Sequence, residues 1–224
     1  MPAKMKDDWN KRARENARYY IASSEDESEA AFDASGRRDV SLFFAGLEDL
    51  LTPQTRALDI GCGIGRMDKH VAPRVGSLIG VDVSGEMVAM ARHRLSGLSN
   101  VEFREGDGES LPVSDASQDL VFSHIVFQHM PRKYARSYFK DTYRALCAGG
   151  HFVFQVPEAS DTTPQDPSED DTWEMRYWTK EQLCDDLGAL GFEFVDELRH
   201  PVESPLLKFN QLRVHFCRGA LHAR

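Results

Sequence analysis

Three glycines at alternate positions, Gly61, Gly63 and Gly65, follow directly on a short apolar stretch at residues 56–60. Glycine adopts backbone angles that other residues avoid, and it lets a ligand lie against the main chain. The residues after the third glycine have helical character, and the first turn of a helix offers N–H groups without intrahelical partners. The spacing therefore predicts a small-molecule site on a glycine turn between a strand and a helix.

Two acids extend this prediction. The dinucleotide-binding fingerprint has its last glycine at the sixth position, and counted from Gly61 that position holds Arg66, so the pattern here is a different one. Asp82 ends the next apolar stretch, 21 residues beyond Gly61, where an acid suits two hydrogen bonds to ribose hydroxyls. Asp107 follows the third apolar stretch, at residues 101–104. Because the carboxyl ends of parallel strands meet at one edge of a sheet, we expect the turn and both acids to line one crevice.

Alternating strands and helices must position these groups. Short apolar stretches between turn residues predict strands, and apolar residues recurring at three and four positions predict helices. Strands are expected at residues 56–60, 77–82, 101–104, 119–124, 151–156, 192–198 and 208–216. Helices are expected at residues 8–22, 40–51, 66–72, 85–96 and 132–148. A further helix is expected to follow the capping box of Thr179 and Gln182 and to end at residue 190. This alternation indicates an α/β fold with a parallel sheet covered on both faces. The last two strands are expected to form a hairpin through residues 200–205, so that one of them runs antiparallel to the rest.

We expect one domain, formed by residues 38–224, with two additions. Residues 1–37 carry Trp9, Tyr19, Tyr20 and Phe32, too many aromatic side chains for a solvated tail, and they predict a helical cap. Residues 158–174 hold seven acids, two prolines and no base. They predict a surface loop within an acidic insertion at 157–178.

Composition limits the partners of the chain. Its 224 residues include 27 Lys and Arg against 36 Asp and Glu, a formal net charge of −9, which argues against a nucleic-acid partner. The four cysteines lie 85, 37 and 33 residues apart without a Cys-x-x-Cys pair, so neither a disulfide framework nor a metal site is expected. Apolar runs are too short to span a membrane and the first residues lack the apolar core of a signal peptide. We therefore expect a reduced, cytoplasmic protein without a membrane partner.

Five motifs follow one another in the order found in the class I S-adenosylmethionine-dependent methyltransferases. They are residues 58–65, 80–88, 106–112, 122–129 and 146–153. Over about residues 40–200 the chain resembles this family, in particular its small-molecule, type 11/25-like group. The resemblance implies a Rossmann-like, seven-stranded mixed sheet of order 3-2-1-4-5-7-6, with an antiparallel last strand, helices on both faces and an N-terminal helical cap.

The resemblance also implies the cofactor, S-adenosylmethionine, which leaves as S-adenosylhomocysteine, and the residues that hold it. The three glycines and Cys62 would lie along the methionine part, with Asp59 near its ammonium group, and Asp82 would bind the ribose hydroxyls. Val83 and Met87 would flank the adenine, Asp107 and Gly108 would meet its edge, and Ser123 and His124 would border the sulfonium and the substrate.

Two histidines after the fourth expected strand are the candidates for catalysis, since an amine or hydroxyl acceptor gives up a proton on methylation. His129 is either a general base or a buried histidine that orders its loop. His124 either lines the substrate or has a structural role. Gln128, Tyr19 and Tyr20 complete the substrate-lining candidates, and packing onto the domain is the competing explanation for the two tyrosines.

The function implied is transfer of a methyl group, by in-line displacement, to an O or N atom of a small-molecule acceptor, by a monomer or homodimer. Two alternatives stay open: methylation of a protein or peptide terminus, and a regulatory protein that binds the cofactor without transferring methyl. Neither a Pro-Cys nucleophile nor an Asn-Pro-Pro-Tyr type of motif is present, which disfavours methylation of cytosine C5 and of adenine or glutamine amino groups. The acids of residues 158–174 predict a preference for cationic or neutral acceptors.

Overall fold

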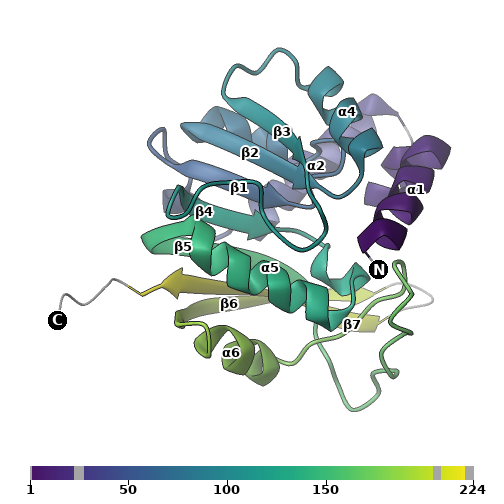
Figure 1. Cartoon of the computed structure of the whole chain (residues 1–224), viewed down its shortest axis with the longest axis vertical. Coiled ribbons are helices and arrows are strands. Elements are labelled where there is room, and N and C mark those ends of the chain that lie inside the picture. Colours follow the sequence, from purple (N-terminus) through teal and green to yellow (C-terminus); the bar gives the residue numbers. More distant parts are fainter. Residues whose placement is uncertain (1, 23–27, 204–207, 220–224) are drawn as a thin grey trace. The chain divides into compact units, whose positions relative to one another are not determined.

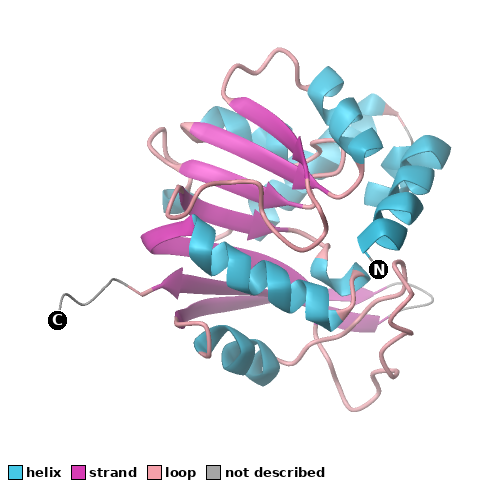
Figure 2. Ribbon diagram, in the orientation of Figure 1, coloured by secondary structure: helices cyan, strands magenta, loops and turns pink. Residues whose placement is uncertain are grey.

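A computed structural model describes residues 2–22, 28–203 and 208–219. These residues form seven strands in the order β3-β2-β1-β4-β5-β7-β6, which confirms the order expected from the sequence (Figure 1). The strands are β1 (Arg56–Ile60), β2 (Ser77–Asp82), β3 (Val101–Glu105), β4 (Gln118–Ser123), β5 (Leu146–Pro157), β6 (Phe192–Glu203) and β7 (Lys208–Arg218). The α-helices are α1 (Pro2–Ala22), α2 (Glu29–Phe43), α3 (Asp68–Val71), α4 (Gly85–Arg94), α5 (Arg132–Ala145) and α6 (Lys180–Gly188), with 3-10 turns η1 (Glu48–Leu50), η2 (Ala72–Arg74) and η3 (Phe127–His129). Helices separate β1 from β2, β2 from β3, β4 from β5 and β5 from β6 along the chain, as expected for an α/β fold (Figure 2).

Residues 1–108 form the first of two compact units, and its three strands are parallel. Their register keeps the carboxyl ends level: Ile60 lies opposite Val81, and Asp82 lies opposite Glu105. The chain leaving each strand stays close to its neighbour, because the Gly61 N–H donates to the Val81 carbonyl at 2.7 Å and the Gly106 N–H donates to the Asp82 carbonyl at 2.8 Å. The glycine turn and Asp82 therefore lie at one edge, as predicted.

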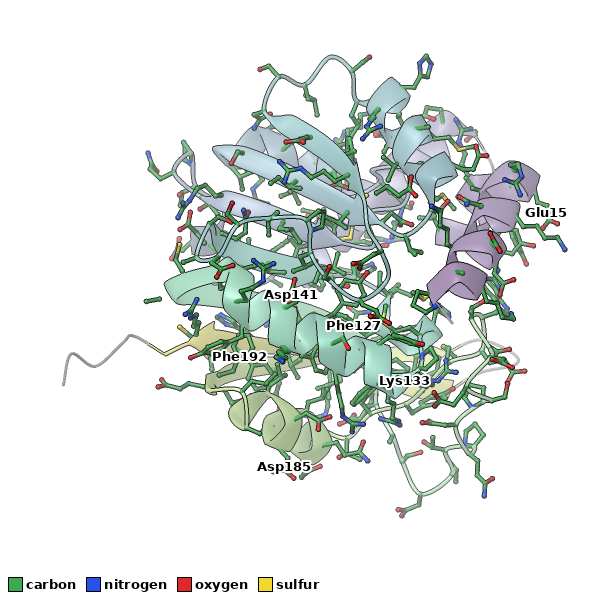
Figure 3. The ribbon with its side chains drawn as sticks, in the orientation of Figure 1. Glu15, Phe127, Lys133, Asp141, Asp185 and Phe192 are labelled. Carbon is green, nitrogen blue, oxygen red and sulfur yellow. The ribbon has the colours of Figure 1, made fainter. Side chains whose placement is uncertain are left out.

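Residues 109–224 form the second unit. β4 and β5 are parallel, whereas β7 is antiparallel to both β5 and β6, which confirms the reversed strand. The expected link at residues 200–205 is wrong in its first part, because residues 200–203 continue β6 and pair with β7, and its last two residues lie outside the described ones. The core of this second unit is rich in aromatic side chains. Phe127, labelled in Figure 3, is fully buried, and its ring centroid lies 5.1 Å from that of Phe139 and 5.3 Å from that of Phe154. Burial of such rings fixes η3, the segment after β4, against α5 and β5.

The helix expected at residues 40–51 is wrong. The structure has α2 ending at Phe43 and only the short turn η1 after it. Ser28 caps α2 by accepting a hydrogen bond from the Ala31 N–H, and the chain turns at Gly46, whose φ is +75°. The apolar periodicity arises because residues of the helix and of the following turn, Phe43 and Leu47 among them, are buried together. The cap boundary expected at residue 37 falls inside α2.

Other element ends differ from the expected ones. α1 begins at Pro2 and contains a break at Asn16, where φ is −168° and ψ is 84°. The Asn16 side chain accepts from the Tyr19 N–H at 3.1 Å and so starts a second helical segment. α5 ends at Ala145, because Leu146 already pairs with Gln118 as part of the sheet. In the part of the chain that the structure describes, no helix has the length and apolar character needed to cross a bilayer.

Candidate active site

The glycine turn after β1 has the backbone conformation that its composition predicts. The φ angles of Gly61, Gly63 and Gly65 are +78°, +53° and +75°, in the left-handed region that side chains with a Cβ rarely adopt. The turn folds back on β2, since the N–H of Cys62 as well as that of Gly61 donates to the Val81 carbonyl. Substitution of these glycines would strain the turn.

Asp82 links this turn to the end of β2. The Gly63 N–H donates to its Oδ2 at 2.9 Å, and the Ser84 N–H donates to its Oδ1 at 2.9 Å. Burial raises the pKa of Asp82 to about 6, although these N–H donors favour the charged form and act in the opposite direction. The acid predicted from spacing therefore lies directly on the glycine turn.

Two further carboxyl groups are buried behind the turn. Asp59 is 4% exposed and Asp68, the first residue of α3, is 0% exposed. Burial raises the pKa of Asp59 well above its ordinary value, and the charge of Asp68 raises it further. Burial also raises the pKa of Asp68. Asp68 was not among the residues identified from the sequence, where the available signal was a second acid nine residues after Asp59.

Helix α1 lies against the same turn and packs on α4 (Figure 1). A Cβ added at Gly63 would come within 2.7 Å of the Ile21 Cδ1 atom, and one added at Gly108 would come within 3.0 Å of the Met5 Cε atom. The Asn10 Oδ1 atom accepts hydrogen bonds from Ser84 Oγ at 2.7 Å and from the Glu86 N–H at 3.2 Å. The first helix thus covers backbone that the resemblance assigns to the cofactor.

The predicted residues of this unit differ in their surroundings. Met87 is buried against α1 in a cluster with Ala13, Ala17, Phe32 and Ile64, whereas Val83 is half-buried and Asp107 exposed. Tyr19 is 45% exposed, and the Tyr20 hydroxyl donates to Glu15 on the same helix. From this segment, Ile21 lies against Gly63 of the glycine turn, and Ala13 and Ala17 pack in one cluster with Ile64 of the turn. Neither Ile21 nor Asn10 was identified from the sequence, because their contacts arise only from the docking of α1.

In the second unit, the segment after β4 holds the catalytic candidates. Ser123 is fully buried and His124 is half-buried. Ile125, the next residue, has a φ of +59°, which is a strained conformation for a β-branched side chain. Such strain persists only where the surrounding structure enforces it, and it redirects the chain between His124 and η3.

His129 is held in one orientation by two contacts. Its Nδ1 lies 2.6 Å from the Trp173 carbonyl oxygen, and its ring stacks on the Trp173 ring at a centroid distance of 5.5 Å. A carbonyl oxygen only accepts, so Nδ1 carries the proton and Nε2 is an acceptor. Nε2 lies 3.2 Å from Nε2 of Gln128, a buried residue. In this tautomer the lone pair that a general base needs is on Nε2, where it accepts from the Gln128 side-chain amino group.

The acidic insertion is folded around basic residues from outside its acidic run. Arg132 of α5 donates to Asp166 and to the Tyr177 carbonyl, and it stacks over the Trp178 ring at 4.2 Å. The buried Arg176 donates to the carbonyls of Ser168 and Asp171. Its own N–H donates to the Gln128 carbonyl at 2.9 Å. The loop is thereby attached to η3 at both Gln128 and His129.

The comparisons with known proteins agree with the family resemblance. Residues 58–154 match the family model described as "Methyltransferase domain". The chain is 34% identical over 155 residues to an arsenite methyltransferase of Halobacterium salinarum, which covers 65% of this chain and 39% of that protein. It is 36% identical over 116 residues to phosphoethanolamine N-methyltransferase 1 of Arabidopsis thaliana, covering 51% of this chain and 23% of that protein. The chain thus spans well under half the length of these curated relatives.

Solved structures share the fold. Magnesium protoporphyrin IX methyltransferase from Synechocystis PCC 6803, solved with bound SAH, superposes with a TM-score of 0.70 at 16% identity and covers 96% of this chain and 98% of that one. The cyclase SpnF superposes with a TM-score of 0.66 at 21% identity, covering 84% of this chain and 82% of that one. At these identities the likeness concerns the fold, and one fold hosts more than one chemistry.

Proposed function

We propose that this chain, which belongs to the class I S-adenosylmethionine-dependent methyltransferases, transfers the cofactor's methyl group to an O or N atom of a small-molecule acceptor. The observation that carries the proposal is the junction of the glycine turn with Asp82. The glycine turn has a left-handed backbone, and the Asp82 carboxylate lies 2.9 Å from the Gly63 nitrogen. Both lie at the carboxyl ends of β1 and β2. This is where open α/β sheets bind their ligands.

The residues present fit S-adenosylmethionine. Asp82 would bind the ribose hydroxyls, the glycine turn would pass along the methionine part, and the acids behind the turn suit the positive charge of the α-ammonium group. Met87 and Val83 would flank the adenine. When bound, the cofactor supplies a methyl group that is already activated on a sulfonium. The protein's task is therefore to align the acceptor and to exclude water.

His129 would remove the proton that an amine or hydroxyl acceptor loses. Its tautomer supports this role, because the Trp173 carbonyl holds the proton on Nδ1 and leaves Nε2 as the acceptor. The same contact anchors the insertion, so a structural role coexists with the catalytic one. His124, Gln128 and the insertion would shape the acceptor site, as loops carry specificity on this fold.

Cofactor binding is the first test. Calorimetry with S-adenosylhomocysteine is expected to show one site per chain and a loss of at least tenfold in affinity for Asp82→Ala, since two charge-assisted contacts disappear. Glu102→Gln is the matched control, because Glu102 is an exposed acid on the neighbouring strand β3. Absence of binding, or equal binding by the Asp82→Ala variant, contradicts the proposal.

Acceptor identity is the second test. Cofactor labelled on its methyl group is incubated with trivalent arsenic, phosphoethanolamine, a porphyrin and a basic peptide, of which the first three follow the names of similar proteins. Label in phosphoethanolamine or in the porphyrin supports the proposal, whereas label on arsenic contradicts it, because the methyl group is then on an atom other than O or N. Label in the peptide favours the peptide methyltransferase, and binding without transfer to any acceptor favours a regulatory protein. With an acceptor in hand, His129→Gln is expected to lower kcat and to remove the base from the pH profile.

A further inference from the structure

The guanidinium group of Arg144, near the end of α5, makes five hydrogen bonds, as many as it has N–H donors. Two of them reach Asp141 on the same helix, from Nε at 2.7 Å and from Nη2 at 2.9 Å. The other three reach the Leu111 carbonyl at 3.0 Å, the Val113 carbonyl at 2.9 Å and Asp115 Oδ1 at 2.6 Å. One side chain therefore joins α5 to three residues of the loop between β3 and β4.

Asp141 adds a second connection between α5 and this loop. Its side chain, labelled in Figure 3, accepts a hydrogen bond from the Leu111 N–H at 2.6 Å as well as those from Arg144. Leu111 is 3% exposed, so its N–H and its carbonyl are both bound by this pair of side chains away from water. Because charge-assisted bonds between a carboxylate and a guanidinium are strong and directional, the Asp141–Arg144 pair fixes the loop in one place.

The backbone of α5 and the start of β5 hold the end of the same loop. The Ala116 N–H donates to the Arg144 carbonyl at 2.9 Å, and the Cys147 Sγ atom donates to the Ala116 carbonyl at 2.9 Å. Ala116 has a φ of +48°, a conformation that a residue with a Cβ keeps only where its surroundings enforce it. Residues 111–117 are thus fixed on α5 within the second unit.

The residues just before this segment are those that the resemblance assigns to the edge of the adenine. Asp107 is exposed, and Gly108 has a φ of +86°. On their other side, the Gly106 N–H donates to the Asp82 carbonyl at 2.8 Å. Residues 107–110 are therefore tied at both ends, which leaves them fewer conformations than a free loop. An exposed carboxylate can select one ligand over another only if its position is fixed in this way.

We propose that Asp141 and Arg144 are positioning residues for adenine recognition, which hold residues 107–110 so that Asp107 faces the 6-amino group of the cofactor. The inference rests on the proposed function and adds to it two residues of α5 that act through the loop. An amino group donates to a carboxylate, whereas a carbonyl oxygen at the same ring position only accepts. A displaced loop loses this preference before it loses the ligand, because the glycine turn and Asp82 do not depend on the pair.

The preference for adenine over hypoxanthine measures the position of Asp107. S-adenosylhomocysteine carries a 6-amino group, and S-inosylhomocysteine carries a 6-oxo group on an otherwise identical skeleton. Calorimetry on the wild-type chain is expected to show at least about tenfold tighter binding of S-adenosylhomocysteine, because the 6-oxo group leaves the carboxylate without its donor. Asp107→Ala should reduce this ratio of affinities to below about threefold and so identify Asp107 as its source.

Substitution of the Asp141–Arg144 pair should lower the same ratio. Arg144→Met removes all five bonds and is expected to bring the ratio below about threefold. Arg144→Lys keeps the charge but has three donors without the planar fork, so it should retain part of the preference. Asp141→Asn loses one of the two oxygens that accept from Arg144 and Leu111 and should have an intermediate effect. Arg136→Met is the matched control on α5, because Arg136 makes an exposed ion pair with Asp186 at 2.9 Å.

Each outcome decides the inference. Affinities for both ligands that fall by the same factor in Arg144→Met would show that the pair only supports the fold, and an unchanged ratio would show that the loop keeps its place without the pair. Equal binding of both ligands by the wild type also overturns the inference. If Arg144→Met fails to fold, Arg144→Lys and Asp141→Asn decide in its place. Absence of wild-type binding to S-adenosylhomocysteine contradicts the proposed function itself, which is a distinguishable failure.

Discussion

Asn10 is the residue whose substitution best tests how α1 is held on the first unit. Its Oδ1 atom accepts one hydrogen bond from Ser84 Oγ and one from the Glu86 N–H. Ser84 is fully buried and its Oγ also caps α4 by accepting from the Met87 N–H at 3.1 Å. The Asn10→Ala variant therefore leaves a buried hydroxyl without its acceptor and an N–H at the start of α4 without a partner.

The expected magnitude follows from these two bonds. At about 0.5–1.5 kcal/mol for each hydrogen bond, the variant loses about 1–3 kcal/mol of the free energy that holds α1 closed. This corresponds to about 5- to 150-fold more frequent opening. The exposed ion pairs of α1, such as Arg14 with Glu86, contribute little because solvent screens them. The apolar contacts of Ala13, Ala17 and Ile21 remain in the variant.

Native-state hydrogen exchange measures this opening directly. Amides of α1 should exchange faster in Asn10→Ala by that factor, while amides of β1 and β2 keep their protection, since local opening leaves the sheet intact. Lys11→Ala is the control on the same helix, because Lys11 makes only an exposed pair with Glu15 at 3.7 Å. An unchanged rate of amide exchange in α1, or an equal acceleration of amide exchange in β1 and β2, would refute the view that Asn10 holds α1 locally on the first unit.

Three further results are expected. Gly63→Ala should destabilise the protein by about 1–2 kcal/mol from its positive φ alone, and more from the contact at 2.7 Å with α1; an unchanged thermal midpoint would contradict this. Arg132→Met should speed limited proteolysis within residues 158–177 without a matching fall in the thermal midpoint. The substitution removes the ion pair of Arg132 with Asp166 and its hydrogen bond to the Tyr177 carbonyl. Cleavage at the wild-type rate would argue against this prediction. Burial and the neighbouring His151 lower the pKa of His215 to about 4, so the unfolded chain binds more protons and stability is lost as pH falls from about 6.5 towards 4. Between pH 7.5 and 5, urea unfolding should show a loss up to about 2 kcal/mol larger in the wild type than in His215→Asn, and parallel pH profiles would oppose it.

Local pattern predicted the strands well, since β1 and β2 are short apolar stretches whose ends are marked by Gly61 and Asp82. Local pattern failed to predict the structure where tertiary packing decides the backbone conformation. The apolar period at residues 40–51 is the same whether the chain continues as a helix or turns at Gly46. Only the packed structure distinguishes the two, because both bury the same side chains.

The proximity of the candidate cofactor residues could be predicted because a parallel sheet brings strand ends together. Asp82 is an example, since its contact with Gly63 follows from the topology. The contacts of Asn10 and Ile21 depend on where α1 docks, and no local pattern specifies that. The acidity of residues 158–174 was visible in the sequence, but the cations that balance it, such as Arg132, lie outside that run.

The insertion between β5 and α6 is closed at its base by backbone hydrogen bonds. Trp178 donates to the Pro157 carbonyl at 3.0 Å, and Ala159 donates to the Trp178 carbonyl at 2.8 Å. The loop therefore leaves and returns at one point. An exchange of residues 160–177 would keep these closing bonds, and it would remove the bonds that Trp173 and Arg176 make to η3. A different loop would have to present a carbonyl oxygen to His129 Nδ1 for the ring to keep its orientation.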